Sequence, residues 1–154
     1  MSSAVQQPEK HRDAGSSDEV LFGPFGVDHV LSRARAGIER VSPDGAALLQ
    51  RHGGLIVDIR PESDRRAEGR IPDSLHVERI VLEWRLDPAG PHRLSGLRPD
   101  QPVVVVCNEG YASSLAAAQL RELGLTRAAD LAGGFRAWSA AGFPVAPGPA
   151  EPQR

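Results

Sequence analysis

The feature that most constrains the fold is a run of four valines, Val103–Val106, which follows Pro102 and leads into Cys107. β-branched residues favour strands, and a run without polar alternation is typical of a strand that helices cover on both faces. An Ala- and Leu-rich segment at Ser113–Leu123, followed by Gly124, predicts a helix. A buried strand that leads into a helix is half of a parallel β–α–β unit, so the sequence predicts an α/β fold.

Shorter segments predict the same alternation of strands and helices. Apolar runs predict three further strands, at 38–41, 55–59 and 128–131. Helical apolar spacing and glycine stops predict five further helices, at 27–36, 44–51, 61–68, 77–86 and 133–141. Ser42 and Pro43 fit the N-cap and first turn of the second helix, and Ile80, Val81 and Trp84 carry the apolar spacing of the fourth. We therefore expect a central parallel sheet of about five strands flanked by helices on both faces.

The length of 154 residues predicts one domain. Residues 1–26 are predicted to be a disordered segment, because the chain starts with a polar stretch that has no apolar period. Residues 146–154 are rich in proline and are predicted to form an extended tail. The folded domain is then expected to span residues 27–145.

Composition excludes several classes of function. A net charge of −2 argues against nucleic-acid and membrane-surface partners. One cysteine permits no intramolecular disulfide, and no Cys/His cluster has the spacing of a metal site, so no metal is expected. No secretory signal and no membrane-spanning run is recognisable, and we expect a cytoplasmic protein. Lysine occurs once and the other basic residues are arginine, which is typical of a GC-rich bacterial genome.

The single cysteine, Cys107, is expected at the carboxyl edge of the parallel sheet, where open α/β sheets bind ligands. The short loop after it must curl back before the next helix, and Gly110 gives that loop conformational freedom. Backbone N–H groups of the loop and the helix N-terminus would then face the sulfur and stabilise a thiolate or a persulfide. The alternative is that Cys107 is an inert apolar residue at a strand end. Ser113 and Ser114 are expected to cap the helix.

Four blocks of the chain, in order, resemble the rhodanese (sulfurtransferase) family. They are Leu55–Arg60 with its D-x-R pattern, Gly69–Ser74, the loop Cys107–Ser113, and the carboxyl-terminal block Leu131–Trp138 with Ala141–Val145. Each block alone is weak, but four in order at domain spacing are specific. The resemblance covers about Ile38 to Val145.

The resemblance implies a rhodanese-like fold and a rhodanese-type sulfurtransferase similar to thiosulfate sulfurtransferase. Cys107 would take sulfur from thiosulfate or a related small donor, hold it as a persulfide, and pass it to cyanide or a thiol. The persulfide would lie in the loop Asn108, Glu109, Gly110, Tyr111, Ala112 and Ser113. No metal or organic cofactor is implied, and a protein sulfur donor is a possible partner.

The chain departs from the family in its loop, which carries no arginine or lysine to attract an anionic donor. Glu109 would repel thiosulfate if it faced the pocket, although a solvent-facing carboxylate is the simpler interpretation. Arg85 is a candidate substrate-binding residue that would replace the missing cation. Arg70 and Asp73 stand where the family commonly has histidine and glycine, and we expect them to affect the surface and turn geometry.

Asp58 and Arg60 end the strand expected beside the strand of Cys107, and they are candidate supporting residues for the loop. An ion pair of Arg60 with a nearby acidic side chain is an equal alternative; the candidates are Glu62, Asp64 and Glu68.

Two other functions compete with the enzyme. A sulfur carrier or regulatory binding module would keep the fold without turnover. A C-x5-R phosphatase needs an arginine six residues after the cysteine, and Ser113 occupies that position.

Overall fold

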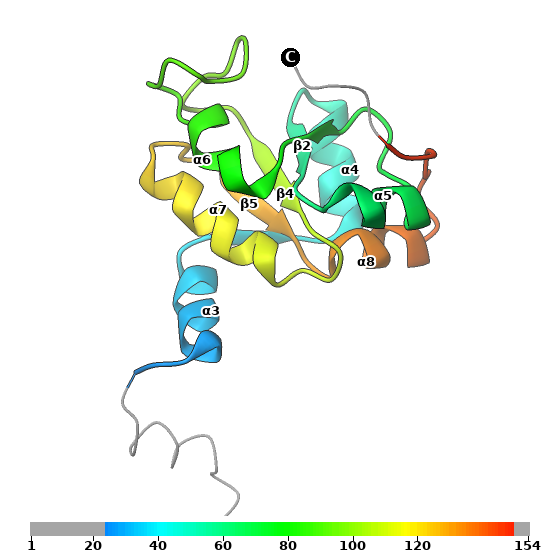
Figure 1. Ribbon diagram of the computed structural model, residues 1–154, viewed down its shortest axis with the longest axis horizontal. Helices are drawn as coiled ribbons and strands as arrows, with labels where there is room; N and C mark the ends of the chain where they lie inside the picture. The colour runs from blue at the N-terminus through cyan, green and yellow to red at the C-terminus, as the bar shows by residue number, and fades with distance from the viewer. Residues whose placement is uncertain (1–23, 150–154) are drawn as a thin grey trace, which may run out of the picture.

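The computed structural model describes residues 24–149, which form an α/β fold of three layers (Figure 1). The predictions for residues 1–23 and 150–154 lie outside the described residues. The strands are β1 (Glu39–Val41), β2 (Leu55–Asp58), β3 (Leu75–His76), β4 (Val103–Val106) and β5 (Ala128–Leu131). The helices are α3 (Val27–Ala36), α4 (Pro43–Arg51), α5 (Glu62–Glu68), the 3₁₀ turn η2 (Arg79–Val81), α6 (Leu82–Arg85), α7 (Ala112–Glu122) and α8 (Gly134–Ala140).

The sheet has five parallel strands, which agrees with the predicted parallel sheet of about five. The order of the strands is β1-β5-β4-β2-β3. The strand β4 lies at its centre, paired with β2 from Leu55↔Val103 to Asp58↔Val106 and with β5 on its other side. Because every strand runs the same way, the residues after β2, β4 and β5 meet at one edge. Cys107 lies at that edge.

Helices cover both faces of β4, which explains its lack of polar alternation. Val103, Val105 and Cys107 pack into one core cluster together with residues of α6 and α7, such as Leu82 and Leu120. The intervening valines pack into a second cluster, formed with residues of α4 and α8. All four valines of β4 are buried.

The segment 77–86 differs from its prediction. It forms the turn η2 and the short helix α6, and 81% of Ile80 and 60% of Trp84 are exposed. The buried residues there are Val77, Leu82 and Leu86. A 3₁₀ turn has three residues per turn, so it shifts the apolar positions away from the period of an α-helix.

Two terminal segments attach to the core. The helix α3 lies outside the layers and packs against α7 (Figure 1). Ala146 pairs with Arg70 in an antiparallel bridge, so the start of the predicted tail is bound to the domain.

Ser42 caps α4 as predicted, because its Oγ accepts a hydrogen bond from Gly45 N at 3.1 Å. Within residues 24–149 no helix is long and apolar enough to span a membrane.

Candidate active site around Cys107

Cys107 lies at the carboxyl end of β4 with its sulfur surrounded by the loop that follows. The backbone N–H groups of Gly110 and Ser113 donate to Sγ at 3.2 and 3.3 Å. The thiol in turn donates to the hydroxyl of Ser113 at 3.2 Å. The loop therefore presents backbone donors to the sulfur, an arrangement that favours an anionic sulfur.

The start of α8 supports the loop from beneath. The N–H of Phe135 donates to the carbonyl of Cys107 at 2.8 Å, and that of Arg136 to the carbonyl of Asn108 at 3.1 Å. Gly134 has a φ of +68°, and a Cβ on it would lie 2.6 Å from the Cys107 carbonyl oxygen. Gly110, with a φ of +90°, lies equally close to the residue before α8, because a Cβ added to it would lie 2.7 Å from the nitrogen of Gly133. Only glycine permits this contact between loop and helix.

Arg60 connects β2 to the loop. Its buried guanidinium donates to both carboxylate oxygens of Asp58, with Nη2–Oδ2 at 2.8 Å, and to the carbonyl of Gly69 at 2.7 Å. Its Nη1 donates to Oδ1 of Asn108 at 3.2 Å. The ion pair of Arg60 is therefore with Asp58, and this geometry suits the supporting role predicted for the two residues.

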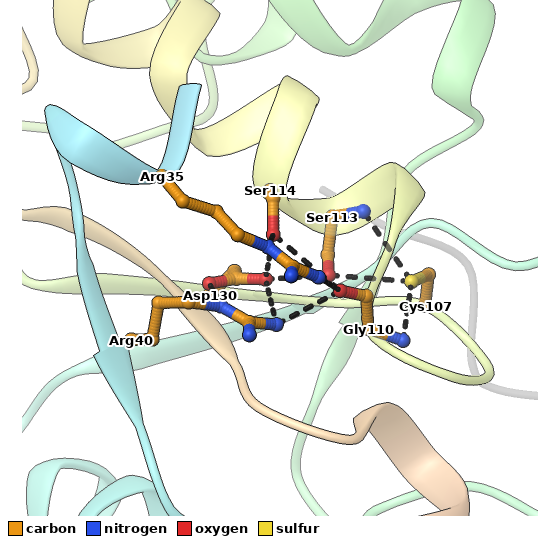
Figure 2. A network of polar contacts seen from close by, with 7 residues as sticks. All are labelled: Arg35, Arg40, Cys107, Gly110, Ser113, Ser114 and Asp130. Atoms are coloured by element: carbon orange, nitrogen blue, oxygen red, sulfur yellow. Dashed lines mark hydrogen bonds and ion pairs between the residues drawn. The ribbon is translucent and has the colours of Figure 1, made fainter. Parts of the chain in front are cut away.

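Ser113 and Ser114 do not cap α7, so that expectation is wrong. The N-cap is Tyr111, without a side-chain cap bond. Both hydroxyls instead donate to Oδ2 of Asp130, at 2.9 and 2.8 Å (Figure 2). Asp130 is fully buried in β5, and it also accepts from Nε of Arg40 at 3.0 Å. A buried carboxylate needs such partners, and two hydroxyls and a guanidinium supply them.

Two arginines reach the loop from behind. Arg35, in the last turn of α3, donates from Nη2 to the carbonyl oxygen of Gly110 at 2.7 Å. Arg40 of β1 donates to the same oxygen at 2.8 Å (Figure 2). Neither arginine was predicted from the sequence, because a bond to a backbone carbonyl leaves no pattern in the side chains. The one available signal was Asp130, a carboxylate within a strand expected to be buried.

A cavity of about 270 Å³ opens above the sulfur. It is lined by Ile59, Arg60, Pro61, Asp64, Arg79, Cys107, Asn108, Glu109, Tyr111 and Ala112. The lining includes Arg79 but not Arg85, whose guanidinium donates to the carbonyl of His92. Arg79 is therefore better placed than Arg85 to meet an anionic donor, although it also binds Glu83 at 3.0 Å. Residues 24–149 contain no cluster of acidic, histidine and cysteine side chains that would hold a metal ion.

Glu109 lies at the rim of this cavity and forms an ion pair with Arg136 at 2.6 Å. Arg136 also binds Glu68 at 3.0 Å, and Asn108 donates to the same carboxylate at 3.2 Å. These hydrogen bonds, that of Arg136 first, hold the pKa of Glu68 below its ordinary value. The rim thus carries a compact ion cluster of two carboxylates around one arginine.

Comparison with known proteins decides which family this fold and loop represent. The family model for the rhodanese-like domain matches residues 42–141. The chain belongs to the rhodanese-like domain family. The match spans the sheet from α4 onward, and it leaves α3 and β1, with Arg35 and Arg40, outside.

Relatives of this rhodanese-like domain include named sulfurtransferases. The chain is 32% identical over 100 residues to thiosulfate sulfurtransferase GlpE of Stutzerimonas stutzeri, covering 65% of this chain and 84% of that protein. It is 35% identical over 91 residues to a sulfurtransferase of Allochromatium vinosum, covering 59% of this chain and 77% of that protein. These relatives support membership of a rhodanese sulfurtransferase family.

A solved structure also resembles this rhodanese-like domain. It is a Rhodopseudomonas palustris protein of unknown function, called a possible tyrosine phosphatase. The TM-score is 0.71 and the identity 34%, with 79% of this chain and 94% of that chain covered. In this rhodanese-like domain the hydroxyl of Ser113 occupies the position where a C-x5-R phosphatase needs a guanidinium.

Proposed function

We propose that this protein is a sulfurtransferase that moves a sulfane sulfur from thiosulfate, or a related small donor, to a thiophilic acceptor through a persulfide on Cys107. The observation that carries the proposal is the environment of the Cys107 sulfur. Sγ of Cys107 accepts two backbone hydrogen bonds from the loop. Cys107 also lines a cavity of about 270 Å³. That volume suits a small anion.

The reaction balances without a cofactor. The thiolate of Cys107 attacks the outer sulfur of thiosulfate, the sulfur–sulfur bond of the donor breaks, and sulfite leaves with the bonding electron pair. Cyanide then attacks the outer sulfur of the persulfide, thiocyanate leaves, and the thiolate is restored. Each step moves negative charge between two sulfur atoms at the loop, where N–H donors stabilise it.

Intact mass spectrometry tests the proposal. Because Cys107 is the only cysteine, a mass gain of one sulfur atom after thiosulfate is assigned without fragmentation. We expect that gain, its removal by cyanide with release of thiocyanate, and neither effect in Cys107→Ser. An unchanged mass in the wild-type protein would contradict thiosulfate as the donor.

A second function is favoured by one feature of the loop. Residues 108–112 contain no cation, and Glu109 places a carboxylate at the cavity rim. A protein that receives sulfur from a partner needs no attraction for small anions. Such a carrier or regulatory module would accept sulfur from a protein donor, a cysteine desulfurase for example, and would turn over thiosulfate poorly. Either role requires a reduced thiol, and we propose that the protein acts in the cytoplasm.

A further inference from the structure

The loop around Cys107 lacks a positive side chain, yet two guanidinium groups bind its middle residue. Arg35 and Arg40 donate to the carbonyl oxygen of Gly110 at 2.7 and 2.8 Å. Both come from α3 and β1, outside the segment that matches the family model. We infer that Arg35 and Arg40 are positioning residues for sulfur transfer, which hold the Gly110–Tyr111 peptide with its N–H toward the sulfur. The inference rests on the proposed function and names further residues of that site.

The geometry of one peptide bond carries the first step. In a planar trans peptide the C=O and N–H bonds point in opposite directions. The carbonyl of Gly110 points toward the two arginines behind the loop (Figure 2). The N–H of Tyr111, in the same peptide, therefore points away from the two arginines. The N–H of Gly110, one residue earlier, contacts Sγ at 3.2 Å. The φ of +90° at Gly110 permits this orientation.

The arginines are themselves held in place. Asp130 binds Arg40 through both carboxylate oxygens, with Nε–Oδ1 at 3.0 Å and Nη2–Oδ2 at 3.2 Å. Ser114 accepts from Nε of Arg35 at 3.0 Å and donates to Asp130 at 2.8 Å. Because these partners fix both guanidinium groups before a donor arrives, little ordering remains during the reaction.

Charge supports the same conclusion. Two arginines and one aspartate leave one net positive charge behind the loop. Two charge-assisted bonds to a carbonyl also polarise its peptide and make the N–H a stronger donor. The chain thus has, behind the loop, the cation that its loop sequence lacks. The cavity mouth stays open to a donor.

This arrangement predicts an asymmetry between the two half-reactions. The outer sulfur of a persulfide carries the negative charge, and the N–H of Tyr111 would stabilise it there. Loss of either arginine would raise the energy of the persulfide more than that of the thiolate. Formation of the persulfide then slows, whereas its reaction with cyanide does not.

Steady-state kinetics with thiosulfate and cyanide test the asymmetry in Arg35→Gln and Arg40→Gln. The matched control is Arg33→Gln, on the same helix α3. We expect kcat/KM for thiosulfate to fall about tenfold in both test variants, the effect of one lost charged hydrogen bond, with kcat/KM for cyanide unchanged or raised. A partly unfolded variant would lower both values equally. Equal losses, or a test variant that behaves like Arg33→Gln, would overturn the inference.

A second measurement separates this inference from the proposed function. If the wild-type protein takes no sulfur from thiosulfate, thiosulfate fails as the donor of the proposed function. The rate of Cys107 alkylation by iodoacetamide then tests the arginines without any donor. We expect alkylation to be about threefold slower in Arg35→Gln and Arg40→Gln than in Arg33→Gln, because the polarised loop also stabilises the thiolate. Equal alkylation rates would overturn the inference on their own.

Discussion

The guanidinium carbon of Arg60 lies 4.1 Å from the centre of the Phe135 ring, and both side chains are buried. The ring makes a cation–π contact with the Arg60 guanidinium, which is also paired with Asp58 and donates to the Gly69 carbonyl. Since Phe135 N also binds the carbonyl of Cys107, this contact joins β2, α8 and the sulfur loop into one unit. The support of the loop is therefore part of the core and depends on one buried ion pair.

Arg60→Met is expected to lower the free energy of unfolding by about 3 kcal/mol, because it leaves the Asp58 carboxylate buried without its cation. Urea denaturation measures the loss. The control is Arg66→Met, which removes an exposed ion pair with Glu62 and is expected to change stability little. Adding Asp58→Asn to Arg60→Met should recover part of the stability. A double variant less stable than Arg60→Met would contradict the role of the pair.

Much of the fold was predictable because the pattern of apolar residues matches the burial of the elements they form. The valine run predicts the central strand, and the residues 27–36 predict α3 with its observed bounds. The strand β3 was not predicted, since two residues show no period. The segment around Ile80 and Trp84 was misassigned, because both side chains are exposed on η2 and α6 while Leu82 is buried.

Only the part of the candidate site that lies within one continuous stretch of sequence was predictable. The placement of Cys107 between a strand and a helix indicates the loop and its backbone donors. The bonds of Arg35 and Arg40 to Gly110 span 75 and 70 residues and end on a carbonyl, so no local pattern encodes them. The pairing of Glu109 with Arg136 likewise depends on how α8 packs beneath the loop.

Gly134→Ala is expected to damage the site more than the fold. Its Cβ would lie 2.6 Å from the Cys107 carbonyl oxygen, so the loop must shift away from α8. Gly142→Ala is the matched control, since Gly142 also has a positive φ, +85°, but no atom within 4 Å of the added Cβ. Both variants carry backbone strain of about 1 kcal/mol. Mass spectrometry measures the rate of persulfide formation, which should fall at least about tenfold in Gly134→Ala only. Equal rates in the two variants would show that the contact does not position the sulfur.

Arg136→Gln is expected to raise the pKa of Glu68 toward its ordinary value of 4.5, because Arg136 is the largest cause of the lowered pKa. The titration of the Glu68 carboxyl carbon by NMR measures this, with Arg121→Gln as a control on α7. The lowered pKa stabilises the folded protein above the unfolded-state pKa, and this contribution is lost as the pH falls through the folded-state pKa. The wild-type protein should therefore lose more stability than Arg136→Gln in that acidic range. An unmoved Glu68 titration would mean that the hydrogen bond of Asn108 and the charge of Arg60 hold the pKa down without Arg136.

Glu109→Gln is expected to increase kcat/KM for thiosulfate about threefold at low ionic strength. The carboxylate lies at the rim of the cavity above Cys107, and thiosulfate is a dianion that this charge repels through a solvent-exposed path. Removal of the carboxylate also releases one of the two partners of Arg136, which adds to the attraction. Asp100→Asn makes the same change of charge before the opposite, amino end of β4 and should leave the rate unchanged. The gain in Glu109→Gln should shrink as salt rises, because exposed charges are screened within about 10 Å at 0.1 M. A gain that persists at high salt would show that Glu109 acts by shaping the loop rather than by its charge.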